Sequence, residues 1–186
     1  MISLGQAHET ELTLEQAGAT RYFWTRLAQD LELAKAVVAL VMKFIVIVVD
    51  YGHSLKDAIV DCDFDWVNSD ITDEHFPAEE DEQGKKENKF RLFHFNRVIQ
   101  DGDEAIREMD KEGCRPATVR ELLAFARVNP EFQRQFPIIA LKSVWVGRDG
   151  ARMVAALFGP SGKRSLHLSY FDRRWRVSCR FLGVSK

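Results

Sequence analysis

Apolar and polar positions alternate in several short runs, and these runs predict the strands of a sheet. Residues Phe44 to Val49 form a β-branched run that indicates a buried strand, and aromatic and polar residues alternate from Phe90 to Phe95. Glycine-containing turns at 147–150 and 159–162 separate further apolar runs, so we expect hairpins there. These later predicted strands are Ile138 to Val146, Arg152 to Phe158, and Arg164 to Val184 with a break near Asp172.

Apolar residues spaced by three or four positions predict helices elsewhere. A short helix near residues 12–20 and a long one from Tyr22 to Met42 would form an N-terminal helical segment. Ser54 is a candidate N-cap for a short helix that ends at Val60. Two main helices follow: Asp103 to Lys111, which Gly113 stops, and a helix after Thr118 whose capping box Glu121 completes and which Asn129 ends.

The order of these elements predicts an α+β fold, with a strand and helices first and a run of antiparallel strands afterwards. We expect an irregular aromatic stretch over 64–70 and a solvated loop over 72–89, where charged residues dominate. The predicted organisation is an N-terminal helical segment, 1–43, followed by one domain, 44–186.

Charge is distributed unevenly along the chain. The net charge is −2, yet the segment from Lys163 to the C-terminus carries +6 and the remainder −8. The totals do not favour a general binder of nucleic acid or anionic membranes. The apolar stretch 33–49 is cut by Lys35 and Lys43, so we expect no membrane span.

Cysteine usage and the first residues predict a reducing compartment. Three cysteines at wide spacings build no disulfide framework and no C-x-x-C pair. The first sixteen residues contain acids where a signal peptide needs a basic and then an apolar stretch. We therefore expect a cytoplasmic protein.

The sequence does not match the local motifs for catalysis or metal binding that it partly resembles. Asp61, Asp63 and Asp65 have the alternate spacing of a calcium loop, but Trp66 stands where its glycine belongs. The run GPSGKRS from Gly159 has too few residues between its glycines for a phosphate-binding loop. None of the five histidines has metal-ligand spacing, and His94 is most simply a half-buried residue of a strand. We expect no catalytic residue, metal or cofactor.

The C-terminal segment RSLHLSYFDRRWRVSCRFLGVS is chemically different. Apolar residues such as Leu166, Leu168 and Trp175 alternate with Tyr, Arg and Ser, which binding surfaces favour. The pattern indicates either a ligand-binding strand and loop or simply a solvated basic hairpin.

This segment resembles the variable region of proteins diversified by diversity-generating retroelements. In such proteins a fixed frame alternates with positions rewritten from adenine-rich template codons. The frame is matched here by Arg164, Leu166, Leu168, Trp175, Arg180, Phe181, Leu182 and Val184, with Gly183 in place of the usual alanine. Upstream, GCRPATVRELLA at 113–124 and ALKSVW at 140–145 are similar to elements of the same proteins and of formylglycine-generating-type C-type lectin folds.

The resemblance implies a C-type lectin-like fold whose variable region, about 164–180, binds a ligand. Mutated AAY codons never encode Lys, Glu, Gln, Met or Trp, and the twelve variable positions contain none of these. It also implies that the strand at 44–49 pairs with the terminal strand near 181–184. The twelve candidate ligand-binding residues are Ser165, His167, Ser169, Tyr170, Phe171, Asp172, Arg173, Arg174, Arg176, Val177, Ser178 and Cys179.

Three functions remain open at this point. The resemblance favours a binding protein, not an enzyme, whose partner is an unknown protein or other macromolecule with an acidic surface. An oxidase of the formylglycine-generating type would use the same fold but needs a copper-binding cysteine pair or a histidine metal site, and the three scattered cysteines argue against it. Interleaved cations and aromatic residues are also typical of single-strand nucleic-acid binders, so nucleic acid is not excluded as a partner.

Overall fold

The computed structural model describes residues 15–16, 18–31, 33–34, 44–159 and 162–186. The chain divides into two units, residues 1–43 and 44–186. In the first unit, helix α2 (Arg21–Gln29) follows Thr20, and its backbone turns to an extended conformation at Asp30. The predicted single helix from Tyr22 to Met42 is therefore wrong at Asp30. Residues 35–43 of that prediction, and most of the predicted helix at 12–20, lie outside the described residues.

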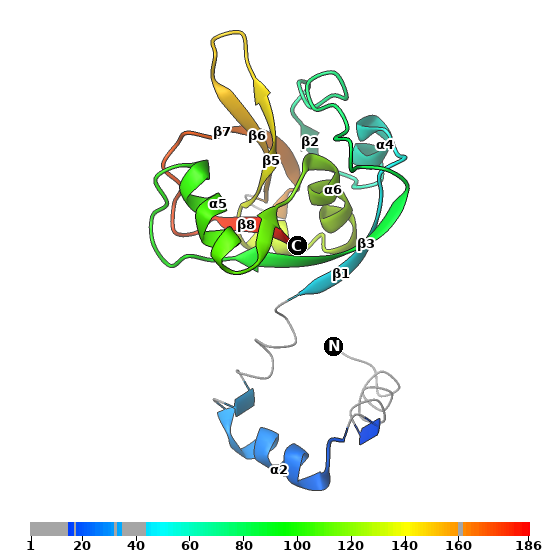
Figure 1. Ribbon diagram of the computed structural model, residues 1–186, viewed down its shortest axis with the longest axis vertical. Coiled ribbons are helices and arrows are strands. Elements are labelled where there is room, and N and C mark those ends of the chain that lie inside the picture. The colour runs from blue at the N-terminus through cyan, green and yellow to red at the C-terminus, as the bar shows by residue number, and fades with distance from the viewer. Residues whose placement is uncertain (1–14, 17, 32, 35–43, 160–161) are drawn as a thin grey trace. The chain divides into compact units, whose positions relative to one another are not determined.

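The second unit is a mixed α/β domain built on one eight-stranded sheet (Figure 1). Seven strands follow the order β1-β3-β8-β5-β6-β7-β2, and β4 pairs with β8. Most pairs are antiparallel, but β5 with β8 and β2 with β7 are parallel, which the predicted antiparallel sheet lacked. The strands are β1 (Ile45–Asp50), β2 (Trp66–Val67), β3 (Lys85–Phe93), β4 (Cys114–Pro116), β5 (Ile138–Val146), β6 (Arg152–Phe158), β7 (Ser165–Tyr170) and β8 (Arg180–Ser185).

Four helices of this domain are described, and three of them begin at a side-chain cap: Ser54 and Thr118, which were predicted, and Asp101, which was not. Ser54 accepts from Asp57 N, Asp101 from Glu104 N and Thr118 from Glu121 N, which satisfies N–H groups that the helix itself leaves free. Gly113 adopts a positive φ of 72° just after the second helix, as a C-terminal stop requires. The helices are α4 (Leu55–Val60), α5 (Gly102–Lys111), α6 (Val119–Val128) and α7 (Phe132–Gln135).

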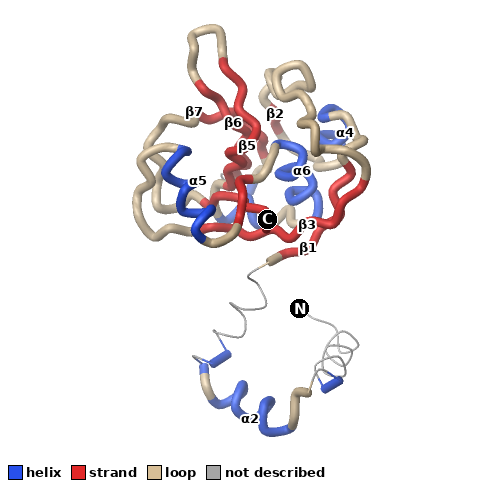
Figure 2. The backbone as a smooth tube through the Cα atoms, viewed as in Figure 1, coloured by secondary structure: helices blue, strands red, loops and turns tan. Residues whose placement is uncertain are grey.

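Two hydrophobic cores lie on opposite faces of the sheet. Successive residues of β5 point to different faces, so Ile138 joins one core and Ile139 the other. Helix α6 packs with β1 in the first core, and α5 packs with the centre of the sheet in the second. Figure 2 shows the two helices beside the strands that separate them.

The predicted direct pairing of the strand at 44–49 with the terminal strand is wrong. Strand β3 lies between β1 and β8 and pairs antiparallel with both, so the two strands share a sheet as second neighbours. The expected loop over 72–89 is wrong at its end, because Lys85 to Lys89 already pair with β1. Within that loop Phe76 is 2% exposed and joins the first core.

Two smaller expectations also need correction. The irregular stretch at 64–70 contains strand β2, where Trp66 pairs with Ser165. His94 is exposed and not half-buried, because β3 ends at Phe93. Its Nε2 lies 3.1 Å from the carbonyl oxygen of Val177.

The GCRPATVRELLA stretch forms a buried polar network that connects α6 with three strands. Arg115 donates to both carboxylate oxygens of Glu121 at 2.9 and 2.6 Å, and Glu121 completes the capping box with Thr118. Tyr51 donates to Glu121 at 2.6 Å and accepts from Asn88 at 2.7 Å. Because Glu121 is fully buried, these partners compensate its lost hydration. The stretch is therefore structural, and it fixes α6 against β1, β3 and β4.

Candidate functional site

The candidate site is the connection between β7 and β8, residues 171–179, which we call the display loop. Phe171 and Trp175 are each 2% exposed, and both belong to the second core. Their burial fixes the loop at two points, so the side chains between and after them are held on a rigid backbone. In Figure 1 this connection runs beside α5 before it enters β8.

Backbone hydrogen bonds fasten both anchors to neighbouring elements. Phe171 N donates to Arg152 O at 2.8 Å, and Gly102 N donates to Phe171 O at 2.9 Å. Trp175 and Ile99 exchange two such bonds as an isolated antiparallel bridge. A Cβ at Gly102 would lie 2.5 Å from the Phe171 ring, so only glycine lets the start of α5 approach the loop this closely.

The structure divides the twelve predicted ligand-binding residues into three groups. His167 and Cys179 are half-buried, and Ser165, Ser169 and Phe171 are buried. The expectation that those last three are displayed is wrong. The seven exposed members, which we call the display residues, are Tyr170, Asp172, Arg173, Arg174, Arg176, Val177 and Ser178.

The buried members lie on strand β7 or directly after it, where both faces of the sheet are covered. Ser165, His167 and Ser169 lie opposite Phe158, Ala156 and Val154 of β6, so they face the second core. The Ser165 hydroxyl donates to Phe158 O at 3.2 Å. His167 packs against Trp66 and Phe158, with ring centroids at 4.4 and 5.1 Å, and burial lowers its pKa. Ser165, His167 and Ser169 therefore face the interior of the domain, and none of them belongs to the exposed display residues.

The frame residues Arg164, Leu166, Leu168 and Trp175 are buried or partly buried, in contrast to the exposed display residues. Leu166 and Trp175 are buried as expected, and Leu168 is partly buried against the first core. Arg164 is 8% exposed and donates to the carbonyl oxygens of Cys62 and Ala126 and to Gln133. Its guanidinium therefore joins three separate segments beneath β7.

Close packing around residue 183 explains why it is a glycine in this chain. A Cβ there would lie 2.7 Å from the Phe93 ring and 3.4 Å from Arg115 O. The absence of a side chain at Gly183 therefore makes room for a large aromatic neighbour on β3.

The arginines of the display loop differ from most others in the domain. Arg91, Arg97, Arg115 and Arg120, for example, all form ion pairs with carboxylates. Arg173, Arg174 and Arg176 form no ion pair with any carboxylate in the described part of the chain, and all three are exposed. Arg173 lies over the Trp175 ring at 5.5 Å. Their charge is therefore available to a partner.

Asp172 is the exception among the display residues, because it holds the loop in place. Arg152 donates to both of its carboxylate oxygens, and the Nε to Oδ2 distance is 3.0 Å. This hydrogen-bonded pair lowers the pKa of Asp172. Arg152 also packs over the Phe171 ring at 4.2 Å and pairs with Asp103 of α5.

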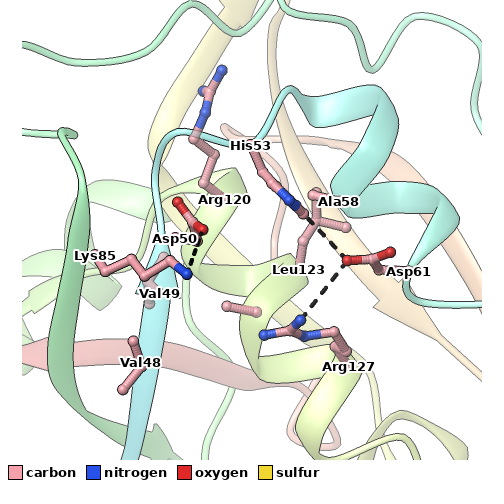
Figure 3. A pocket seen from close by; sticks show the side chains of 11 residues that line it. Val48, Val49, Asp50, His53, Ala58, Asp61, Lys85, Arg120, Leu123 and Arg127 are labelled. Carbon is pink, nitrogen blue, oxygen red and sulfur yellow. Dashed lines mark ion pairs between the residues drawn. The ribbon is translucent and has the colours of Figure 1, made fainter.

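A separate pocket lies between β1, α4 and α6 (Figure 3). Its charged residues are paired with opposite charges: Lys85 lies 3.4 Å from Asp50, Arg127 lies 3.8 Å from Asp61, and Arg120 pairs with Asp73 and Glu82 outside the lining. His53 lies 3.7 Å from Asp61. Val49 and Leu123 supply apolar lining. Because opposite charges there compensate each other, the pocket lacks the uncompensated charge of the display loop.

Two kinds of reactive site, a metal centre and an activated cysteine, depend on how side chains are arranged and ionised in the described residues. No group of three His, Cys, Asp or Glu side chains among them is arranged to hold a metal ion. Burial raises the pKa of Cys62 to about 11 and also raises that of Cys179, so both are protonated thiols at neutral pH. Among the described helices none is long and apolar enough to cross a membrane.

Sequence reasoning missed the residues that anchor the display loop from outside it. Ile99, Gly102 and Arg152 come from distant parts of the chain and carry no shared local pattern. The glycine at the first position of a helix was the one available signal, because a small residue there permits close packing.

The chain matches no protein-family model, no curated protein and no solved structure. The site is therefore interpreted from its own geometry.

Proposed function

We propose that this protein is a diversified ligand-binding protein of the retroelement variable type, with a C-type lectin-like fold. The observation that carries the proposal is the division of residues 164–184 into buried frame positions and an exposed loop. A surface of this kind can change its side chains without loss of the core, because the anchors and the frame hold the backbone.

The display residues favour a protein partner with an acidic surface. Tyr170 is 55% exposed and Val177 is 44% exposed, which gives apolar contact area beside three arginines. Arginine forms bidentate hydrogen bonds with carboxylates, and tyrosine contributes large contact area at low conformational cost. Recognition of this kind requires no catalytic group.

The alternative of an oxidase on the same fold has weaker support. That chemistry needs two cysteines at one metal or a histidine metal site. Cys62 belongs to the first core, whereas Cys114 and Cys179 both contact the second. Burial raises the pKa of Cys179, which opposes the thiolate that a metal binds, and the described residues contain no group of three metal-ligating side chains. The nucleic-acid alternative keeps support from the arginines, but Phe171 and Trp175 are buried and cannot stack with bases, which leaves Tyr170 as the single exposed aromatic ring among the display residues.

A capture experiment tests the proposal. The wild-type chain is immobilised beside a variant with Arg173→Ser, Arg174→Ser and Arg176→Ser, and the proteins captured from the native host are compared. A matched control carries Lys56→Ser, Lys89→Ser and Arg107→Ser, which remove the same charge from exposed positions elsewhere. We expect a partner that the control retains and the loop variant loses. A partner bound equally by all three proteins would overturn the proposal.

A further inference from the structure

A concave site lies directly beside the display loop and includes Tyr170, one of the display residues. We call it the aromatic pocket. It is lined by residues of β5, β6 and β7, of the loop between β2 and β3, and of the β5–β6 turn. The residues that matter here are Asp70, His75, Trp145, Asp149, Met153 and Tyr170.

The floor of the aromatic pocket is a row across three neighbouring strands. Trp145 lies opposite Met153, and Met153 lies opposite Tyr170, so the three side chains share one face of the sheet. His75 extends the row, because its ring stacks on Trp145 with centroids 4.2 Å apart and an angle of 13°. The Nδ1 of His75 lies 2.8 Å from the carbonyl oxygen of Asp70, which orients the ring.

The groups that line this pocket are mostly electron-rich. Asp70 and Asp149 bring two carboxylates, and neither forms an ion pair with a residue in the described ranges. Arg148 is the one arginine or lysine in the lining, so the two carboxylates outnumber its charge. Aromatic faces attract cations through their quadrupole, and a thioether is a soft, polarisable neighbour. This chemistry is complementary to a positive charge on an alkyl stem.

We propose that the aromatic pocket receives a lysine or arginine side chain of the bound partner. The inference rests on the proposed function, because Tyr170 belongs both to the pocket and to the display residues. The site then has two subsites of opposite charge: arginines that meet acidic groups, and a pocket that accepts one basic side chain. Two subsites of opposite charge side by side determine how the partner is aligned on this surface, as well as how tightly it binds.

Side-chain analogues test the pocket without knowledge of the partner. The full chain is labelled with ¹⁵N, and the indole N–H signal of Trp145 is assigned with a Trp145→Phe variant. Titration with N-acetyl-lysine amide should shift this signal to saturation. N-acetyl-norleucine amide has a similar stem without the charge and should not. Equal response to both analogues, or no saturable shift with either, would overturn the inference.

Substitutions of different lining residues should change the affinity for N-acetyl-lysine amide in opposite directions. Tyr170→Ala and Asp149→Asn should each weaken lysine amide binding by about two- to fivefold, as expected for exposed cation–π and charge contacts. Asparagine keeps an oxygen that can accept from Ala151 N, as Asp149 does at 3.1 Å. Arg148→Gln should tighten binding, because it removes the like charge. Glu87→Gln, on the exposed face of β3, is the control and should change nothing. Weakening by Arg148→Gln would contradict the proposal.

The two proposals fail in different ways. If lysine amide does not bind while partner capture still depends on Arg173, Arg174 and Arg176, only the pocket inference is wrong. If lysine amide binds but partner capture ignores those arginines, the proposed function is wrong instead.

Discussion

At the scale of single residues, burial separates the side chains that hold the site from those that form it. Trp175 and Phe171 are held in the second core, while Arg174 and Val177 face solvent a few positions away. Alternation in the sequence predicted this division for Trp175 and Leu166. It failed for Ser165, Ser169 and Phe171, because period two does not reveal that strand β7 is covered on both faces.

The first prediction concerns the anchor of the display loop. Trp175→Ala should lower the free energy of unfolding by about 3–5 kcal/mol, because it removes a large side chain from a packed core. Arg174→Ser should change it by no more than about 0.5 kcal/mol, since the side chain is exposed. Chemical denaturation of both variants measures the difference. Similar losses for the two would contradict the division into anchor and display.

The second prediction concerns Tyr51 in the buried network. Burial and the hydrogen bond to Glu121 raise the pKa of Tyr51 strongly above its ordinary value of about 10. The folded state therefore keeps a proton that the unfolded state releases, and stability from this residue is present below about pH 10 and lost as pH rises above it.

Tyrosinate absorbance and denaturation at alkaline pH measure this effect. Tyr51→Phe should leave the tyrosinate signal of the folded protein unchanged and make the loss of stability above about pH 10 shallower. A variant whose folded protein loses tyrosinate signal would show that Tyr51 ionises in the native state, against the prediction.

At the scale of elements, local patterns predicted most of the domain's strands and helices. The bounds of β5 and β6 agree with the sequence pattern, and the capping box of α6 is present as expected. The wrong predictions concern segments whose secondary structure depends on tertiary contacts. The charged residues at 85–89 form a strand because β1 pairs with them, and Trp66 forms one because β7 begins beside it.

The third prediction concerns the contact between α5 and the display loop. Gly102→Ala places a methyl group 2.5 Å from the Phe171 ring, so the ring and the loop must move. We expect a loss of about 1–3 kcal/mol in the free energy of unfolding, as for other overpacked sites. Gly84→Ala serves as a control, because its Cβ meets nothing within 4 Å but its φ is 64°. Any loss of stability in the control should then come from backbone strain alone. A ¹⁵N spectrum of Gly102→Ala should show chemical-shift changes across 171–179 that the spectrum of Gly84→Ala lacks.

At the scale of the whole molecule, topology brings the site together. Residues 99–102, 152 and 171–175 are far apart in the chain, yet backbone hydrogen bonds join them. The sequence pattern contains no information on strand order, which is why the predicted pairing of 44–49 with the terminal strand missed the intervening β3. The anchors of the display loop could not be predicted for the same reason.

The fourth prediction follows from the charge distribution, with +6 at the C-terminal end of a chain whose total is −2. Exposed charges mainly steer encounter and are screened over about 8 Å at physiological ionic strength. Raising the salt concentration should therefore slow association with the captured partner more than it speeds dissociation. Surface plasmon resonance across a salt series measures both rates. A salt effect confined to dissociation would contradict the role given to the exposed arginines.

The central claim is that residues 164–180 are diversified while the frame is kept, and sequencing the flanking DNA tests it most directly. We predict a reverse transcriptase gene and a near-copy of the codons for 164–180 that differs from them only at adenines. Within that copy, the codons for Tyr170, Arg173, Arg174 and Arg176 should differ, and those for the buried anchor Trp175 and frame residue Arg164 should be identical. A flanking region with neither the gene nor the near-copy would contradict the account.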